Sequence, residues 1–333
     1  MRPCKNINVQ KCLYMFTDSH SSSDSSQNNE NIAQDKAQIS GKVDDPVGRE
    51  GHFGVFTLHK GIHSLVELVR NADTGEELVI KWLHANSFLG RIFRQASLND
   101  NTARTPNAVS SSEIPKEVSI LKQIEHPNIV KLVRAIEEPN EGLYGLVMEY
   151  LKKGALQNIP DSYVFTSEQV WTYFDDILEG LDYLHQRKIV HRDINPNNLL
   201  ITEDDRIRIA DFGLSEMFTG EDAELMGTIG TVPYLAPECV RQPPKPYKGK
   251  PVDIWALGMT LYWILKRQTY YHGTNKYQIM EAISKQPVIL DKELRKSEFV
   301  NILELVFQAN PGQRGTTTEL KVKRRGQATK EGS

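Results

Sequence analysis

Two short motifs in the second half of the chain carry the residue types that phosphoryl transfer needs. The run His191–Leu200 contains Asp193 and Asn198, and Asp211 follows in the turn Asp-Phe-Gly. Asp193 can accept a proton from a hydroxyl group, whereas Asn198 and Asp211 offer the oxygen ligands that Mg²⁺ prefers. The spacing His-Arg-Asp-x-x-x-x-Asn, followed closely by Asp-Phe-Gly, is very unlikely to arise by chance. The motifs therefore predict a site that transfers a phosphoryl group.

A lysine far upstream extends this prediction to the phosphates of a nucleotide. Lys81 lies near the end of the strand-like run 78–82, and Glu117 lies on the helix expected next. A lysine at a strand end can neutralise phosphate oxygens if a carboxylate fixes its position. The alternative is that Lys81 is an ordinary exposed lysine at a strand end. The motifs later in the chain favour the phosphate-binding role instead. We therefore expect a Lys81–Glu117 ion pair.

Two segments compete for the role of the glycine-rich phosphate loop. Residues 48–55 contain three glycines, but they lie too far before Lys81 for one compact hairpin. Residues 58–66 are placed correctly for two short strands and a turn, so we favour this register. Its three loop positions are His59, Gly61 and Ser64. Because only one of them is glycine, the side chains limit how closely the loop approaches a phosphate.

Hydrophobic periodicity divides the chain into a strand-rich first part and a helix-rich second part. Strand-like patterns occur at residues 63–70, 78–82, 129–136 and 142–150. Helical spacing occurs at residues 113–124, 170–186 and 252–265, the last of which is almost wholly apolar. These patterns predict an α+β fold of two lobes with a cleft between them.

Composition narrows the class of protein and its partners. The chain has 333 residues, 39% of them hydrophobic, and a formal net charge of −3. That charge gives no electrostatic reason to expect nucleic acid or a membrane as a partner. The three cysteines are scattered, which argues against a disulfide framework or a cysteine metal site. Without a signal-like or membrane-spanning apolar run, a cytoplasmic or nuclear protein is expected.

We expect one catalytic domain between two tails. Ser-rich residues 1–51 are expected to be a disordered tail, either a plain extension or a phospho-regulated segment. Residues 52–318 form the domain, which consists of an N-lobe at 52–148, a hinge at 149–154 and a C-lobe at 155–318. A polar insertion at 88–112 interrupts the N-lobe. Residues 319–333 are expected to be a basic, solvated tail.

The order of these motifs resembles the eukaryotic protein kinase family over residues 58 to about 315. Ala236-Pro237-Glu238 and the run Asp253–Gly258 extend the match. The resemblance implies a bilobal kinase fold that uses ATP and Mg²⁺. It makes Asp193 the catalytic base, Asn198 and Asp211 the metal ligands, and Lys81–Glu117 the pair that orients the phosphates. It also implies a buried Glu238–Arg314 ion pair and makes Asp253 the anchor of the catalytic loop.

The resemblance further assigns a nucleotide-binding site. Adenine would lie among aliphatic side chains and pair with the backbone of the linker at 148–151. The residue at position 79 is Val where the family usually has Ala, so the roof of the pocket is expected to be crowded. The implied binding residues are Leu58, Gly61, Ser64, Val66, Val79, Lys81, Met148, Glu149, Leu151, Asn198, Leu200 and Asp211.

Further segments resemble serine/threonine kinases, and most closely the calcium/calmodulin-dependent protein kinase kinases and related upstream kinases. These segments are Pro196, Glu125–Leu132, Tyr183–His191, Ile207–Gly213, Gly227–Thr231 and Gly230–Glu238. The resemblance implies protein substrates, including activation-loop threonines of downstream kinases. No calmodulin-binding segment is evident, because the residues after Gly315 lack apolar anchors at helical spacing. Arg192 could pair with a phosphorylated Thr228, or Thr228 is simply an exposed loop residue.

One position in the catalytic run departs from the family. Asn195 replaces the lysine that would stabilise negative charge on the γ-phosphate, a loss of about 2–4 kcal/mol. If this is the weak point, Asn195→Lys should raise turnover. We therefore weigh an active kinase against a weakly active or pseudokinase scaffold that binds nucleotide or partner proteins. The enzyme is favoured because the base, the metal ligands and the Lys–Glu pair are all present. A third class, a small-molecule phosphotransferase, is disfavoured because the activation-segment motif and the helix that carries Asp253 resemble protein kinases specifically.

Overall fold

The computed structural model describes residues 52–60, 64–71, 74–84, 114–138 and 143–331. The predicted tail at 1–51, Gly61 and the insertion at 88–112 lie outside these ranges. The chain divides into two compact units. One comprises Met1–Val118 and Leu132–Tyr150, and the other comprises Ser119–Lys131 and Leu151–Ser333. A strand-rich unit and a helix-rich unit confirm the predicted α+β fold.

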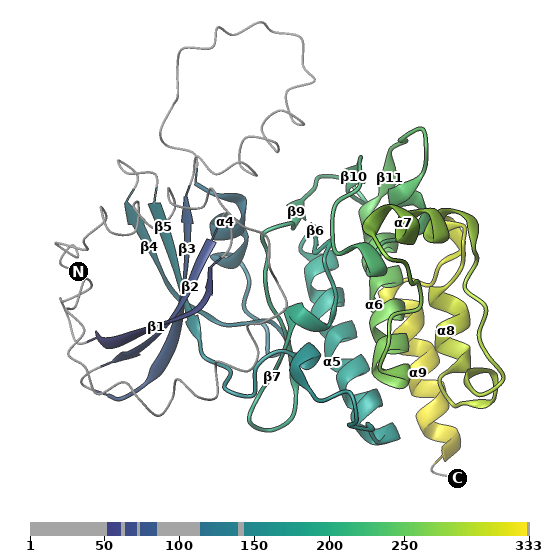
Figure 1. The fold of residues 1–333 in the computed structure, drawn as a ribbon, viewed down its shortest axis with the longest axis horizontal. Helices are drawn as coiled ribbons and strands as arrows, with labels where there is room; N and C mark the ends of the chain where they lie inside the picture. Colours follow the sequence, from purple (N-terminus) through teal and green to yellow (C-terminus); the bar gives the residue numbers. More distant parts are fainter. Residues whose placement is uncertain (1–51, 61–63, 72–73, 85–113, 139–142, 332–333) are drawn as a thin grey trace, which may run out of the picture. The chain divides into compact units, whose positions relative to one another are not determined.

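The first unit is built on one five-stranded antiparallel sheet, with strand order β1-β2-β3-β5-β4 (Figure 1). Its strands are β1 (His52–Lys60), β2 (Ser64–Asn71), β3 (Glu77–His84), β4 (Leu132–Glu138) and β5 (Leu143–Glu149). The predicted hairpin is confirmed as β2 and β3. The predicted helix is shorter than expected, because α4 (Lys116–Leu121) occupies only the middle of residues 113–124.

Strand alternation gives this sheet two faces with different roles. One face carries a buried cluster of Leu65, Val69, Leu78, Ile80, Trp82, Leu143 and Val147. Trp82, fully buried, donates from Nε1 to Glu67 Oε2 at 2.8 Å, which satisfies its one polar atom. The opposite face receives Lys81, because Lys81 alternates with Ile80 and Trp82. The core on one face therefore fixes the direction of the lysine on the other.

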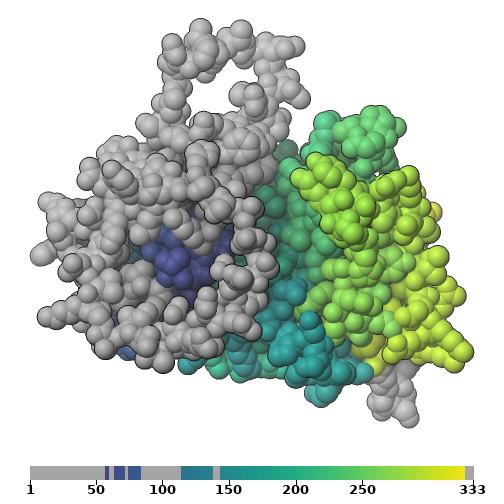
Figure 2. Space-filling view, viewed as in Figure 1, coloured from purple at the N-terminus to yellow at the C-terminus, as the bar shows by residue number. Residues whose placement is uncertain are grey.

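The second unit is mainly helical, with three short two-stranded pairings (Figure 1). Its main helices are α5 (Ser167–Gln186), α6 (Gly249–Lys266), α7 (Lys276–Lys285), α8 (Val300–Val306) and α9 (Thr317–Glu331). The pairings join β6 (Ile189–Val190) to β9 (Glu216–Met217), β7 (Leu199–Ile201) to β8 (Ile207–Ile209), and β10 (Glu224–Leu225) to β11 (Tyr247–Lys248). Residues 151–326 are coloured from teal to yellow in the space-filling view (Figure 2). Within the described ranges, no helix combines the length and apolar character needed to cross a membrane.

The two predicted long helices are confirmed as α5 and α6. Helix α5 starts with a capping box, in which the Thr166 side chain accepts from Gln169 N and the Gln169 side chain accepts from Thr166 N. Helix α6 is buried along most of its length, as its apolar composition predicts. It carries Asp253, whose contacts organise the candidate site.

Helix α6 packs so closely on α8 that glycine is required at the crossing. A Cβ on Gly258 would lie 2.5 Å from Val306 Cγ2 and 3.0 Å from Phe307 Cε1. We expect Gly258→Ala to lower the free energy of unfolding by about 1–3 kcal/mol, the usual cost of overpacking a core. Gly326→Ala in α9 is the matched control, because a Cβ there meets open space. Denaturant midpoints check this prediction, and equal midpoints for the two variants would contradict it.

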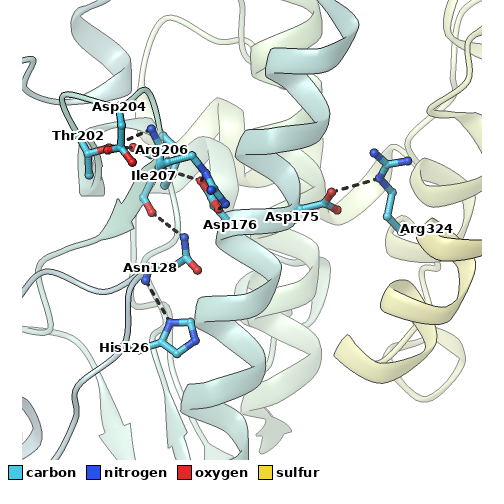
Figure 3. Close-up of polar contacts among 9 residues, drawn as sticks. All are labelled: His126, Asn128, Asp175, Asp176, Thr202, Asp204, Arg206, Ile207 and Arg324. Atoms are coloured by element: carbon cyan, nitrogen blue, oxygen red, sulfur yellow. Dashed lines mark hydrogen bonds and ion pairs between the residues drawn. The ribbon is translucent and has the colours of Figure 1, made fainter. Parts of the chain in front are cut away.

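The basic C-terminal end differs from the prediction of a solvated tail, because residues 317–331 form helix α9. Lys321 Nζ lies 2.6 Å from both Glu179 Oε2 and Asp182 Oδ2 on α5. Arg324 donates from Nε to Asp175 Oδ2 at 3.3 Å (Figure 3). Because α5 presents its carboxylates three and four residues apart, they form one acidic row that the basic helix pairs with. These contacts hold α9 against α5.

Candidate active site

The first unit brings Lys81 and Glu117 together, as predicted. Lys81 Nζ donates to Glu117 Oε1 at 2.7 Å, and the two side chains are only 11% and 7% exposed. Lys81 lies on β3 between Val66 of β2 and Leu146 of β5, whereas Glu117 lies in the first turn of α4. A buried pair is little screened by solvent, so the carboxylate holds the ammonium group firmly in one place.

The other nucleotide-binding residues predicted in this unit lie mainly on the same face as Lys81. Val66 pairs with Lys81 directly, and Val79 pairs with Met148 two positions along. Glu149 pairs with Leu78 and so points to the opposite face. Its predicted contact would therefore have to come from its backbone.

The β1 strand bears on the choice between the two glycine-loop registers. It runs through Gly54 and ends at Lys60, so the connection to β2 falls at residues 61–63. This is where the favoured register places the loop, although Gly61 itself lies outside the described residues. Leu58 is 45% exposed and lies at an irregularity in the β1–β2 ladder, and Ser64 begins β2.

In the second unit, the carboxylate of Asp193 is oriented by two donors. Oδ1 accepts from the backbone N–H of Thr231 at 2.8 Å, and Oδ2 accepts from Nδ2 of Asn198 at 2.7 Å. The same Nδ2 also donates to the Asp193 carbonyl oxygen at 2.9 Å. A carboxylate has about four acceptor positions, so two donors leave room for a substrate hydroxyl. The geometry suits a fixed proton acceptor.

The loop that carries Asp193 is anchored by Asp253, as predicted. Asp253 is fully buried and accepts from the backbone N–H groups of His191 at 2.9 Å and Arg192 at 2.7 Å. Its Oδ2 also lies 2.9 Å from His185 Nε2. Arg192 has a φ of +69°, a conformation that non-glycine residues adopt reluctantly. The anchored N–H groups hold the loop in this shape.

The predicted Glu238–Arg314 ion pair also forms. Arg314 donates from Nη1 to Glu238 Oε1 at 2.8 Å and from Nη2 to Glu238 Oε2 at 3.2 Å, and both residues are buried. Nη1 makes a second hydrogen bond to the carbonyl of Pro251, near the start of α6. The stretch from Asp211-Phe212-Gly213 to Ala236-Pro237-Glu238 is called the activation segment here. The ion pair ties the end of this segment to the helix that carries Asp253, which is a structural role.

The two predicted metal ligands are brought to adjacent segments. Asn198 ends the 3₁₀ helix η3 (Pro196–Asn198), and its carbonyl accepts from Ala210 N at 2.8 Å, directly before Asp211. Asp211 has a φ of +61°, and its Oδ1 accepts from Gly213 N at 3.1 Å. Because Asn198 Nδ2 is used by Asp193, its Oδ1 is the atom suited to a metal ion. Two oxygen donors fit Mg²⁺, which takes its remaining ligands from phosphates and water.

Among the residues that the structure describes, no group of three or more His, Cys, Asp and Glu side chains is arranged to hold a metal. The two oxygen donors at 198 and 211 would hold Mg²⁺ together with the phosphates of a nucleotide.

The β7–β8 hairpin, which contains Leu200 and leads to Asp211, is fixed from behind by α5 and residues 126–128 (Figure 3). Asp176 on α5 accepts from Ile207 N at 2.8 Å and from Arg206 Nε at 2.9 Å. Asn128 Nδ2 donates to the Ile207 carbonyl at 3.1 Å. Leu200 and Leu151, predicted to contact nucleotide, both belong to this second unit. The support is rigid because Asp176 and Asn128 are themselves buried.

The contacts of Asn195 were not predicted from the sequence. It is 1% exposed, and its Oδ1 accepts from Asn197 N at 3.0 Å, so that it caps η3. Its Nδ2 donates to the Asp193 carbonyl at 3.0 Å and to Thr231 Oγ1 at 3.2 Å. The side chain therefore makes its polar contacts inside the protein. Sequence reasoning missed Thr231 as a functional residue, although the Gly230-Thr231 motif signalled its position.

The activation segment shows a contact that the sequence did not predict for Arg192. Its Nη1 lies 3.8 Å from Glu216 Oε2, so a carboxylate is already beside the guanidinium group. The hydroxyl of Thr228, an exposed residue, donates to the Cys239 carbonyl at 2.8 Å. Burial, with Glu238 nearby, raises the pKa of the Cys239 thiol to about 12, so the thiol stays neutral and unreactive. Phosphorylation of Thr228 stays a prediction.

Comparison with known proteins agrees with this geometry. Residues 57–324 match the family model described as protein kinase domain. The chain is 34% identical over 272 residues to a calcium/calmodulin-dependent protein kinase kinase of Caenorhabditis elegans, covering 80% of this chain and 50% of that one. It is 30% identical over 275 residues to the serine/threonine-protein kinase ssp1 of Schizosaccharomyces pombe, covering 80% and 41%. It is 29% identical over 263 residues to the serine/threonine-protein kinase GRIK2 of Arabidopsis thaliana, covering 79% and 62%. The chain thus spans less than two thirds of the length of these relatives.

Proposed function

Since the chain belongs to the protein kinase family, we propose that it transfers the γ-phosphate of ATP to serine and threonine hydroxyls of protein substrates. The observation that carries this proposal is the carboxylate of Asp193. It is held by Thr231 N–H and by Nδ2 of Asn198, and Asn198 is itself one of the two predicted metal ligands. In such a reaction the protein acts mainly by positioning and electrostatic stabilisation.

Each residue has a separate part in the proposed mechanism. Asp193 accepts the hydroxyl proton and aims the attacking oxygen, because its two donors fix the plane of the carboxylate. Lys81, fixed by Glu117, places its positive charge beside the phosphates and orients them. Asn198 and Asp211 would hold Mg²⁺, which neutralises phosphate charge when bound.

A weakly active or pseudokinase scaffold is the second candidate, and specific residues favour it. His59 and Ser64 replace two loop glycines, and Asn195 replaces a lysine. Against it stand the base, both metal ligands and the Lys81–Glu117 pair. A scaffold has no need of these chemical groups. We therefore place the enzyme first.

The finer parts of the proposal concern substrates and location. One relative is named as a kinase that acts on kinases, which supports activation loops of downstream kinases as substrates in a signalling cascade. The net charge of −3 gives no electrostatic reason to propose nucleic acid or a membrane as a partner. A location in the cytoplasm or the nucleus is part of the proposal. We do not propose calmodulin as a partner.

Replacing Lys81 tests the proposal in the first unit. We expect Lys81→Met to lower kcat/KM for protein phosphorylation by roughly 10²–10³-fold, since a positioned donor to charge in the transition state is lost. Lys81→Arg keeps the charge but not the compact ammonium geometry, so it should fall between Met and wild type. Transfer of label from radioactive ATP to a protein mixture measures this. Equal labelling by wild type and Lys81→Met would contradict the proposal.

A further inference from the structure

The side chain of Asn195 makes two sets of hydrogen bonds, one through Oδ1 and the other through Nδ2. Its Oδ1 accepts from Asn197 N at 3.0 Å, which is a local cap of the following 3₁₀ helix. Its Nδ2 donates to the Asp193 carbonyl and to Thr231 Oγ1, and the second of these bonds crosses from the catalytic loop to the activation segment. An amide has two N–H donors, so both are used. With 1% exposure, the side chain is not directed toward solvent.

The same chain contains a second Asn that makes only the local cap. Asn310 precedes Pro311 as Asn195 precedes Pro196, and its Oδ1 accepts from Gly312 N at 3.0 Å. Asn310 is exposed, whereas Asn195 is buried. Because Asn310 makes the cap alone, a comparison of the two residues distinguishes the effect of the cap from the effect of the Asn195–Thr231 hydrogen bond. Capping alone explains an Asn before Pro196, but it does not explain burial or the bond to Thr231.

Thr231 is held on both sides by the catalytic loop. Its N–H donates to Asp193 Oδ1 at 2.8 Å, while its Oγ1 accepts from Asn195 at 3.2 Å. Gly230 permits this approach, because it has a φ of +119° and a Cβ there would lie 2.8 Å from the Arg192 carbonyl oxygen. One residue of the activation segment therefore orients the proposed base and bonds to Asn195 at once.

We propose that Asn195 is a positioning residue that acts through Thr231 on Asp193, and that it does not act on the transferred phosphate. This inference rests on the proposed kinase function and deepens it. The Asn195 amide fixes Thr231 Oγ1, and the fixed Thr231 directs its N–H at the Asp193 carboxylate. The departure from the family is therefore a clamp between two segments and not a weakened catalytic donor.

A lysine at this position could not replace the clamp. Lysine has no acceptor, so the Asn197 N–H would lose its cap. Its charged group would also have to leave a site that is 1% exposed, or remain there at a desolvation cost. Asn195→Lys is therefore expected to lower turnover, the opposite of the gain predicted if Asn195 were only a missing charge.

The test is a double-mutant cycle in the full chain with Asn195→Ala, Thr231→Val and the pair together. Misplacement of a reacting group by about 1 Å costs on the order of 10²-fold, so each single variant should lower kcat by roughly 10- to 100-fold with KM for ATP nearly unchanged. The double variant should be no slower than the slower single one. Thr231→Ser should recover most of the loss, and Asn310→Ala should keep wild-type kcat. The inference would be overturned if the two single losses in kcat multiplied in the double variant. A raised KM for ATP, or a higher turnover with Asn195→Lys, would also overturn it.

Hydrogen exchange provides a readout that does not need activity. The Thr231 N–H should exchange faster in Asn195→Ala than in wild type and remain protected in Asn310→Ala. If the wild-type protein transfers no phosphate, the proposed function is wrong. The exchange result still shows whether Asn195 holds Thr231 in place. Unchanged Thr231 exchange in Asn195→Ala would overturn the inference. Thr231→Val leaves the cap intact, so it tests the same bond even if Asn195→Ala does not fold.

Discussion

Replacing Asp193 by Asn is expected to lower kcat by roughly 10²–10⁴-fold, the range that general base catalysis contributes. The amide has nearly the same shape as the carboxylate but cannot accept the hydroxyl proton. The bond from Thr231 N–H to the Asp193 side chain can persist, because an amide oxygen also accepts. The loss should therefore appear in kcat, while affinity for nucleotide stays near that of wild type.

Steady-state kinetics and nucleotide titration check this expectation together. Asp161→Asn is the matched control, because the Asp161 side chain is 90% exposed. It makes the same chemical change away from the proposed base, and it should leave kcat unchanged. If Asp193→Asn and Asp161→Asn turned over at the same rate, Asp193 would not be the base.

Replacing Asp253 by Ala should have the largest effect on stability. The substitution leaves the His191 and Arg192 N–H groups and the His185 ring without their shared acceptor in a fully buried place. We expect the free energy of unfolding to fall by about 3–5 kcal/mol, the cost of removing one member of a buried, hydrogen-bonded charged pair. Because Arg192 then loses what holds its positive φ, kcat should fall as well.

Urea unfolding measures this loss, with Asp253→Asn as the matched variant. Asn keeps one acceptor oxygen, so its loss should be smaller than that of Ala. If Asp253→Ala cost under about 1 kcal/mol, the value typical of a surface ion pair, the anchoring role would be wrong.

Much of the site could be predicted because motif residues meet through strongly determined geometry. Strand alternation and hairpin pairing place Lys81 on a defined face opposite Val66, and the next helix brings Glu117 to it. The Glu238–Arg314 and Asp253 contacts also agree with their predicted roles. For these last two the resemblance to the kinase family supplied the prediction, and burial explains why each charged group has a hydrogen-bonded partner.

The remaining features depend on contacts between residues that are far apart in the sequence, and local sequence patterns do not reveal such contacts. The basic run near Lys321 suggests a solvated tail until the acidic row on α5 is known to lie beside it. Asn195 suggests a missing charge until Thr231 is seen to accept its hydrogen bond. In both cases a polar side chain has several possible partners, and only the tertiary fold selects one.

The central claim is that this chain transfers phosphate to protein hydroxyls, and phosphoamino-acid analysis tests it most directly. Purified wild type and Asp193→Asn are incubated with Mg²⁺, radiolabelled ATP and a kinase-inhibited lysate, and the labelled proteins are hydrolysed. The account predicts label on phosphoserine and phosphothreonine with wild type and at least roughly 10²-fold less with Asp193→Asn. Labelling by wild type no greater than by Asp193→Asn would contradict it.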